Sequence, residues 1–445
     1  MTYKRFFCWT IILGWLALSA SVPAVAKTLS LKQSVDYGLT HSPLLQGAAI
    51  RVNQAEVQIK SERGRFLPNL STGYSYNKLK NISASGPADT DYIDQTQGTG
   101  SVSIRQTLFA GFEYKSRFER AKFEKLYEKA RLDMQKLDLR LQITETFFEL
   151  LKIRQDIFYI SKTIQRLESD LAAAKSFNAK QMAPYVHVLQ ADADLEEARQ
   201  QLWQTQTTEK RLTSTLKRLI GMDQEIGNAS AEKIIFDDKL DLPGFQQTGE
   251  LSVSIDKALK NRPEIKLLLT ELKMADADSQ VAISAYYPRV TLDMNLYDFD
   301  KKYDNLSKAN QKNRYWKTGV NVSWNLFDGG TAYYKNQKSQ LEKRRLKTEI
   351  RQATLEIKEE VNISVNELEE TRKRLDSVKR ALYAAQENYD REKTRFQARL
   401  STTSRVLEAQ ARLARAEARR SQSLLDFQVS MARLSHAMGS YDSKE

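Results

Sequence analysis

Four stretches of the chain alternate apolar and polar residues with the two-residue period of a β-strand. In the clearest, Trp316, Thr318, Val320, Val322, Trp324 and Leu326 share one face, and Lys317, Gly319, Asn321, Ser323 and Asn325 share the other. The same alternation runs through 70–76, 101–108 and 290–296. Strands of about ten residues with one apolar face are typical of a membrane β-barrel. A soluble sheet covered by helices fits the pattern equally well.

The connections within the two strand pairs, 77–98 and 300–314, are long and polar, which suits the outer end of a barrel. After each strand pair, apolar and small residues recur at steps of three and four. These series are Ile157, Ile160, Ile164, Leu167, Leu171, Ala174, and Leu407, Ala411, Ala414, Ala418, Ser421, Leu425. The spacing predicts coiled-coil helices. A continuous helix over 113–177 would be roughly 95 Å long, and packing between chains is expected because one chain offers no core for such rods.

The chain also repeats itself. An offset of 220 residues matches Leu31 with Leu251, Asp36 with Asp256, Leu39 with Leu259, Pro43 with Pro263 and Pro68 with Pro288. An offset of 218 matches Leu108-Phe109 with Leu326-Phe327, Gly111 with Gly329, Val188-Leu189 with Val406-Leu407, and Gly221 with Gly439. Because the register holds across both halves, we interpret the chain as a tandem duplication.

Each half is predicted to contain an opening helix, a strand pair and two long helices. The opening helices span 31–63 and 252–285, and both stop before an aromatic residue and a proline. The first repeat covers 27–222 with strands at about 69–108, and the second covers 251–439 with strands at about 289–327. An irregular connector over 223–250 lies between them, and 440–445 form a tail.

The N-terminus predicts that the chain is exported from the cytoplasm. Lys4 and Arg5 precede an apolar run over 6–20 and the small residues Ala24 and Ala26, so 1–26 is predicted to be a signal peptide rather than a single membrane anchor. The only cysteine, Cys8, lies inside it, and we therefore expect no disulfide and no thiolate site in the exported chain.

Charge and motifs argue against other classes. The chain carries a net charge of +13, but its charges are interspersed along helices and export makes nucleic acid a poor partner. His41, His187 and His436 lack metal-ligand spacing, and Asp298, Asp300 and Asp304 lack the glycine and glutamate of a calcium loop. No phosphate loop, nucleophile elbow or zinc motif is present. We expect no cofactor, no metal and no enzymatic activity.

In this order, and given twice, the motifs resemble the outer-membrane efflux (TolC) family over nearly the whole exported chain. They are Ser42-Pro43, Arg262-Pro263, Pro68, Pro288, Leu326-Phe327-Asp328-Gly329-Gly330, Val406-Leu407-Glu408-Ala409-Gln410 and Met438-Gly439. The resemblance implies an α+β membrane protein: a homotrimer whose four strands per chain form a twelve-stranded β-barrel, continued by a periplasmic α-helical coiled-coil barrel. Four strands are too few to close a membrane barrel alone, so the strand count per chain agrees with a trimer.

The resemblance also suggests site residues at the periplasmic tip, where helix-to-helix turns are expected near 179–184 and 397–403. Adaptor-docking candidates are Lys180, Gln181, Met182, Ala398, Arg399, Leu400 and Ser401, although the glycine usual in these family turns is absent. Phe396, Arg405 and Glu408 are the gate candidates. Glu408 could equally be an ordinary exposed carboxylate, and Arg405 could pair with it at spacing i, i+3.

The function implied is a passive exit duct in the outer membrane of a Gram-negative bacterium, extending into the periplasm. A periplasmic adaptor would open it and an inner-membrane pump of ABC, RND or MFS type would energise it, for small-molecule efflux or type I protein secretion. The alternative is a soluble periplasmic coiled-coil adaptor or structural protein, which would explain the heptads but not the four amphipathic strands.

Overall fold

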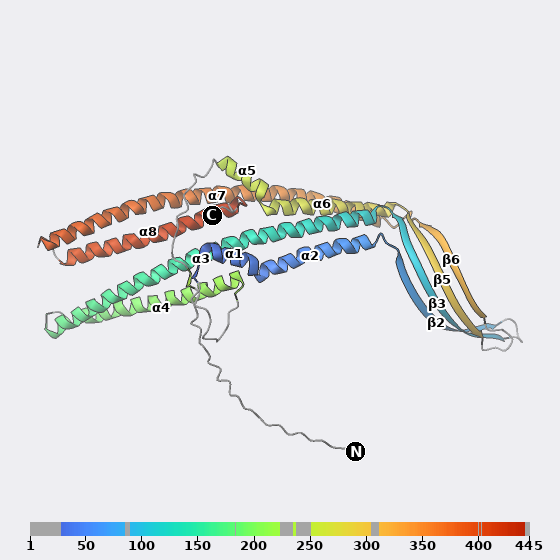
Figure 1. The fold of residues 1–445 in the computed structure, drawn as a ribbon, viewed down its shortest axis with the longest axis horizontal. Helices are drawn as coiled ribbons and strands as arrows, with labels where there is room; N and C mark the ends of the chain where they lie inside the picture. Colours follow the sequence, from blue (N-terminus) through green and yellow to red (C-terminus); the bar gives the residue numbers. More distant parts are fainter. Residues whose placement is uncertain are drawn as a thin grey trace, which may run out of the picture.

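The computed structural model describes residues 28–84, 90–182, 184–222, 235–236, 251–303, 311–398, 400–401 and 403–440. The predicted signal peptide, and most of the predicted connector and tail, lie outside the described residues. The protein is elongated, with a sheet at one end and two helical hairpins at the other (Figure 1).

The sheet contains the four predicted strands in the order β2 (Asn69–Ala84), β3 (Thr90–Ala110), β5 (Arg289–Tyr303) and β6 (Gln311–Ser323), all antiparallel. The β3–β5 pairing joins the two repeats. The strands β2, β3 and β5 are longer than predicted, and much of 77–98 pairs as strand, for example Lys78 with Thr96. The alternation did not predict the full strand length, because the apolar residues end before the backbone pairing ends. The strand β6 starts earlier than the predicted alternation and ends at Ser323, so Trp324 and Leu326 lie beyond it.

The opening helix of each repeat is broken, which corrects the prediction of one continuous helix. In the first repeat α1 (Leu31–His41) ends at Ser42 and α2 (Pro43–Gly64) follows. In the second, α5 (Leu251–Asn261) ends at Arg262 and α6 (Pro263–Ile283) follows. A proline disfavours the α conformation of the residue before it, and Ser42 and Arg262 accordingly have ψ of 123° and 125°.

The two long helices predicted for each repeat are present. The helices α3 (Glu113–Ala179) and α7 (Thr331–Gln397) have 67 residues each and run away from the sheet. After a tight turn, α4 (Val186–Ile220) and α8 (Thr403–Ala437) return with 35 residues each. As a result α4 ends where α2 begins, and α8 ends where α6 begins, while α3 and α7 pass these levels unbroken (Figure 1).

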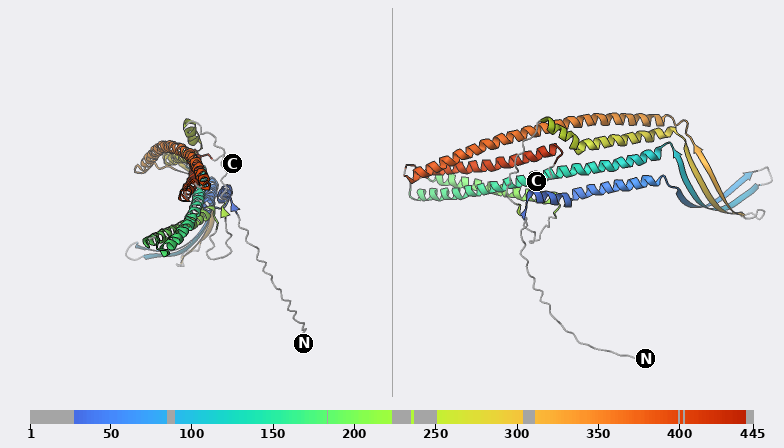
Figure 2. Two further views of the ribbon diagram at one scale, coloured as in Figure 1. Left: turned by 90° about the vertical axis from the view of Figure 1, so that its left-hand side faces the viewer. Right: turned by 45° about the horizontal axis from the view of Figure 1, so that its top comes forward.

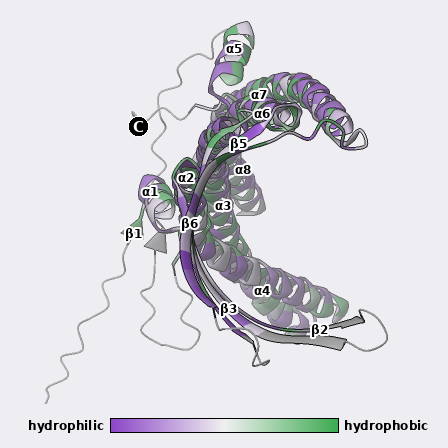
Figure 3. Cartoon of the chain, turned by 90° about the vertical axis from the view of Figure 1, so that its right-hand side faces the viewer, coloured by the Kyte–Doolittle hydropathy of each residue, from purple (hydrophilic) through white to green (hydrophobic). Residues whose placement is uncertain are grey.

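The sheet and helices together follow one arc. Seen from the strand end, α1 and α5 lie on its convex side (Figure 3), and the views of Figure 2 agree. A two-stranded parallel pair, β1 (Thr28–Leu29) with β4 (Ile235–Phe236), joins the start of the first repeat to the only described residues of the connector.

The core is divided between the repeats. The largest buried cluster belongs to the first, where α1, α3 and α4 bring together Val35, Leu139, Ile143, Phe147, Leu150, Leu212, Leu216 and Ile220. The second repeat has two smaller clusters, one around Ala258, Ile357, Val361 and Ala437 and one around Leu368, Leu375, Phe427 and Leu434. The duplication is also visible in the backbone, because Gly221 and its match Gly439 both have positive φ, at 77° and 61°.

Candidate functional site

One face of the sheet is an exposed apolar band. Neighbouring positions across the four strands are Leu70, Ile104, Met294 and Thr318 in one row, and Thr72, Val102, Leu296 and Trp316 in the next. Their large apolar side chains are exposed, and the sheet projects beyond the helices with neither face covered (Figure 1). This excludes a soluble sheet packed under helices and favours contact with lipid.

The opposite face is polar in the half of the sheet next to the helices. A row across the sheet reads Ser71, Ser103, Asn295 and Lys317. In the adjacent row Arg105 Nε donates to Asp293 Oδ1 at 2.6 Å, and Thr291 donates to the same carboxylate. Small polar residues leave room for water, as the lumen of a membrane barrel requires.

Aromatic residues gather at both ends of the apolar band. At the helix end, the rings of Phe109, Phe112 and Tyr287 meet edge to face at 5.4 to 6.4 Å, and Trp324 Nε1 donates to the carbonyl oxygen of Tyr286. At the far end Tyr74, Tyr76 and Trp316 are exposed on the apolar face, whereas Tyr297 and Tyr315 stack at 5.1 Å on the polar face. Such girdles mark the two interfaces of a membrane barrel, where amphipathic rings are favoured.

The two hairpin turns have matching geometry. Met182 donates its backbone N–H to the carbonyl of Phe177, and Leu400, 218 residues later, donates to the carbonyl of Arg395. These six-to-one bonds satisfy carbonyls at the ends of α3 and α7. In the first turn Gln181 occupies the left-handed region, with φ of 57°, where a glycine would be expected. Met182 and Leu400 are exposed at 71% and 70%, so each turn presents one apolar side chain.

The remaining docking candidates lie around the same turns. Lys180 caps the end of α3 and Ala398 caps the end of α7. Ser401 donates to Glu392 Oε2 at 2.5 Å, which ties the second turn to the last turns of α7. Arg399 lies outside the described residues.

The gate candidates lie on either side of the second turn. Phe396 is on the last turn of α7, 44% exposed, and Arg405 is exposed on the first turn of α8. Glu408 accepts a hydrogen bond from Arg412 at 2.6 Å, and both side chains are 62% exposed. The partner of Glu408 is thus Arg412, four residues later, and not Arg405, which the sequence had offered as one alternative.

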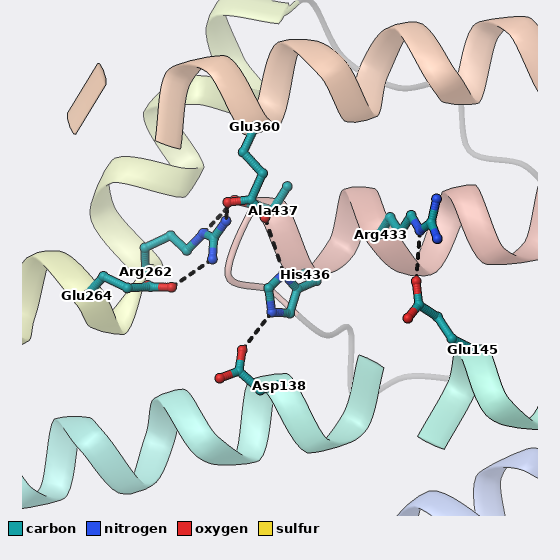
Figure 4. Close-up of polar contacts among 8 residues, drawn as sticks. All are labelled: Asp138, Glu145, Arg262, Glu264, Glu360, Arg433, His436 and Ala437. Carbon is teal, nitrogen blue, oxygen red and sulfur yellow. Dashed lines mark hydrogen bonds and ion pairs between the residues drawn. The ribbon is translucent and has the colours of Figure 1, made fainter. Parts of the chain in front are cut away.

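A buried ionic cluster at the joint of α6 and α8 was missed by the sequence analysis (Figure 4). Arg262, only 2% exposed, donates from Nε to the carbonyl oxygen of Ala437 at 2.9 Å and from Nη1 to Glu264 at 2.8 Å, and it also pairs with Glu360 of α7. His436 of α8 contacts Asp138 of α3 at 3.0 Å and Glu360 at 3.4 Å. The residues lie far apart in sequence, so no local pattern signalled them.

This cluster sets the charge of its histidine. Burial alone lowers the pKa of His436, but hydrogen bonds to Asp138 and Glu360 outweigh it and raise the pKa to about 9. The same hydrogen bond from His436, with Arg262 nearby, lowers the pKa of Glu360. Protonated His436 therefore links α8 to both α3 and α7 at neutral pH. Nearby, Arg433 of α8 makes a second link, to Glu145 of α3 at 2.7 Å and Glu367 of α7 at 3.7 Å.

Among the described residues, no group of His, Cys, Asp and Glu side chains is arranged to hold a metal ion. No helix in the described part of the chain is long and apolar enough to cross a membrane.

Comparison with known proteins agrees with this geometry. Two segments, 36–222 and 254–440, each match the outer membrane efflux protein family. The chain is 25% identical over 411 residues to the pyoverdine export outer membrane protein OpmQ of Pseudomonas aeruginosa, covering 91% of this chain and 82% of that one. It is 22% identical over 283 residues to the toxin and drug export protein A of Aggregatibacter actinomycetemcomitans, covering 64% and 59%.

Among solved structures, the CmeC outer membrane channel of Campylobacter jejuni superposes with a TM-score of 0.76 at 16% identity, over 93% of this chain and 87% of that one. The expected fold class is confirmed: two repeats supply four antiparallel strands and long helices, as in a protomer of the TolC-like trimeric channels. The protein is an export duct of the outer membrane that extends into the periplasm, and it belongs to the outer membrane efflux protein family.

Proposed function

We propose that three copies of this chain form a passive duct that receives its cargo from an inner-membrane pump through a periplasmic adaptor. The sheet is the main support for this proposal. It has an exposed apolar face, and within the described residues its edge strands β2 and β6 each have one unpaired edge. A sheet cannot end with open edges in lipid, where every backbone N–H and C=O needs a partner inside the protein. Pairing β6 of one copy with β2 of the next removes all open edges.

The two turns are the proposed adaptor-docking surface. Met182 and Leu400 are supported by their equivalent positions and their exposure at the extreme ends of the hairpins. Two equivalent turns per chain would present six similar apolar points in a trimer, which suits a ring of adaptor chains.

We expect the double variant Met182→Gln and Leu400→Gln to lose crosslinking to the adaptor in cells. Tyr383→Gln, equally exposed but within α7, serves as control; equal crosslinking in both variants would refute this docking surface.

The gate is proposed at Phe396, Arg405 and Glu408, at the tip of the second hairpin. Removing the Glu408 carboxylate frees Arg412 and changes the charge at the mouth of the duct. We expect Glu408→Ala to change the conductance or ion selectivity of single channels in planar bilayers, and unchanged currents would rule out a gating role for Glu408.

The first experiment is fractionation of membranes followed by native mass determination in detergent. A protein found in the outer membrane at three times the protomer mass supports the trimeric duct. A monomer or dimer found in the periplasm would contradict the trimeric duct and favour the soluble adaptor.

The pump and the cargo class are separate questions. The relatives named above are an exporter of pyoverdine and an exporter of toxin and drugs, and both kinds of cargo fit a passive duct. Pumps of ABC, RND and MFS type are each compatible with it. Deleting the gene and comparing the secreted proteins with drug susceptibility identifies the cargo class, since a change in only one of the two is expected.

A further inference from the structure

The helix α8 carries a stripe of charged residues toward the tip. Arg405, Glu408, Arg412, Arg415 and Arg419 are all exposed and succeed one another at steps of three and four, so they share one face of the helix. We refer to these five residues as the arginine stripe. Continued by the same steps, the face reaches Asp426 and then Arg433 near the end of α8.

Arg433 shows which way the stripe points. It lines a groove that includes the buried Ser364 of α7 and, on the exposed side, Glu359 and Ile363. Glu359 and Ile363 follow Ile357 and Val361 by two positions, about 200° around the helix, so the groove opens away from those two residues. Ile357 and Val361 pack against Ala258 of α5, and α5 lies on the convex side of the arc (Figure 3). The groove and the arginine stripe therefore face the concave side, which becomes the lumen when three copies close.

The stripe is strongly basic after pairing is taken into account. Glu408 neutralises Arg412, whereas Arg405, Arg415 and Arg419 make no ion pair within the described parts of the chain. Three uncompensated guanidinium groups per chain thus line the inner face near the mouth. Deeper in the duct the charge differs, because Arg433 is held between Glu145 and Glu367, and Glu359 adds a further carboxylate.

The first repeat shows that this charge is not a general property of the hairpins. At the repeat offset of 218, the positions of the stripe are occupied in α4 by His187, Gln190, Asp194, Glu197 and Gln201. Arg412 and Arg415 are thus replaced by carboxylates in an otherwise equivalent helix of the same length. Of the two returning helices, only α8 carries the basic face, and it lies between α3 and α7 in the arc, whereas α4 presents Asp194 and Glu197 at the matching positions (Figure 1).

From this placement we infer that the mouth of the duct recruits anionic solutes, meaning cargo that carries carboxylate, phosphate or sulfate groups. A lumen lined by one sign of charge concentrates ions of the opposite sign and speeds their entry, and rings of arginine favour anions in pores. The inference rests on the proposed duct, and it adds the charge of the solute that the duct accepts.

The test is the reversal potential of the purified trimer in a planar bilayer with a KCl gradient. We expect wild type to prefer chloride over potassium. The triple variant Arg405→Gln, Arg415→Gln, Arg419→Gln should lower the chloride preference by roughly threefold or more. Arg420→Gln is the matched control for Arg419→Gln, because Arg420 is also exposed but lies 100° away around the helix.

The outcomes separate the two proposals. A correctly assembled trimer that stays without conductance even together with its adaptor and pump would overturn the duct itself. A conducting trimer that prefers potassium, or a triple variant with unchanged selectivity and the wild-type native mass, would overturn only the role of the arginine stripe. An effect of Arg420→Gln equal to that of Arg419→Gln would also contradict it, since the charge would then act without regard to the face.

Discussion

The two repeats build the same joint with different chemistry. In both, a returning helix ends at a left-handed glycine, Gly221 or Gly439, which packs against the residue before a proline. In the first repeat Ile143, Leu216 and Ile220 fill the joint and are fully buried. In the second, the position matching Ser42 is Arg262, and the buried ionic cluster takes the place of much of the apolar core.

This difference teaches which features a duplicated joint needs. The backbone requires glycine after one helix and proline at the start of the next, because both fix dihedral angles that other residues adopt poorly. The side chains are free to diverge. An apolar joint is stabilised by burial alone, whereas a buried ion pair must first offset the loss of hydration of its charges. The second joint should therefore depend more on single residues and on pH.

The largest expected effect follows from removing the buried cation. Arg262→Ala removes a side chain that is only 2% exposed and leaves the carbonyl of Ala437 without its donor, and we expect the emptied site and the lost hydrogen bond to lower the free energy of unfolding by about 3 to 5 kcal/mol. The matching Ser42→Ala should lower it by less than about 1 kcal/mol, because the Ser42 side chain makes no capping hydrogen bond. Thermal unfolding in detergent, followed by circular dichroism, measures both; similar losses would contradict the contrast.

For the two glycines we expect the larger loss of stability in the first repeat. A Cβ at residue 221 would lie 2.5 Å from the carbonyl oxygen of His41, whereas a Cβ at residue 439 would lie 3.0 Å from the backbone nitrogen of Arg262. We expect Gly221→Ala to lower the free energy of unfolding by roughly 2 to 4 kcal/mol and Gly439→Ala by roughly 1 to 2 kcal/mol, from the backbone strain and the clash. The same unfolding assay decides, and a larger loss for Gly439→Ala would show that the second joint is the tighter one.

The pH dependence should belong to the second joint alone. Because the pKa of His436 is raised from 6.5 to about 9 in the folded protein, its stabilising effect is complete below pH 6.5 and is lost as the pH rises through 9. The groups that face His436 are Asp138 of α3, Glu360 of α7 and the neighbouring Arg262. We expect roughly 1 to 3 kcal/mol to be lost between pH 7 and pH 10.

The control for this pH effect comes from the first repeat, where the position matching His436 is Arg218. Substituting His436→Arg keeps a positive charge at every pH of the experiment. The variant should lose the part of the pH dependence that wild type shows between pH 7 and pH 10. An unchanged profile would mean that other groups cause it.

The smallest effect is expected where charge is exposed. The pair of Glu408 and Arg412 lies in solvent at the tip, so Arg412→Ala should change the free energy of unfolding by less than about 0.5 kcal/mol. Set beside Arg262→Ala, this variant tests whether burial, and not the mere presence of an ion pair, makes the second joint sensitive. A loss comparable to that of Arg262→Ala would contradict this view.

Much of the fold was predictable because its signals are local. Alternation predicted the four strands, heptad spacing predicted the long helices, and the repeat offset predicted the equivalence of the two turns. The breaks before Pro43 and Pro263 were missed although the proline rule would have indicated them, since the apolar pattern continues across both. The ends of the strands were missed because pairing extends beyond the apolar band.

The ionic cluster could not be predicted in the same way. Arg262, Glu360 and His436 each look like ordinary surface residues in their own helices, and only the meeting of α6, α7 and α8 brings them together around the buried Arg262. The two turns lie where the helices end, after Ala179 and Gln397, close to the predicted positions, whereas the partner of Glu408 could not be chosen from the sequence. A choice between arginines at i−3 and i+4 depends on rotamers that the sequence does not fix.

The two unpaired edges of the sheet also have a kinetic consequence. One copy, or two, leaves backbone groups of β2 or β6 without partners in lipid, so no stable intermediate exists between the free chain and the closed ring inside the membrane. The rate of insertion should then rise more steeply than linearly with the amount of chain exported. A cell that makes little of this protein would accumulate unassembled copies in the periplasm, exposed to its proteases, before the first complete duct appears.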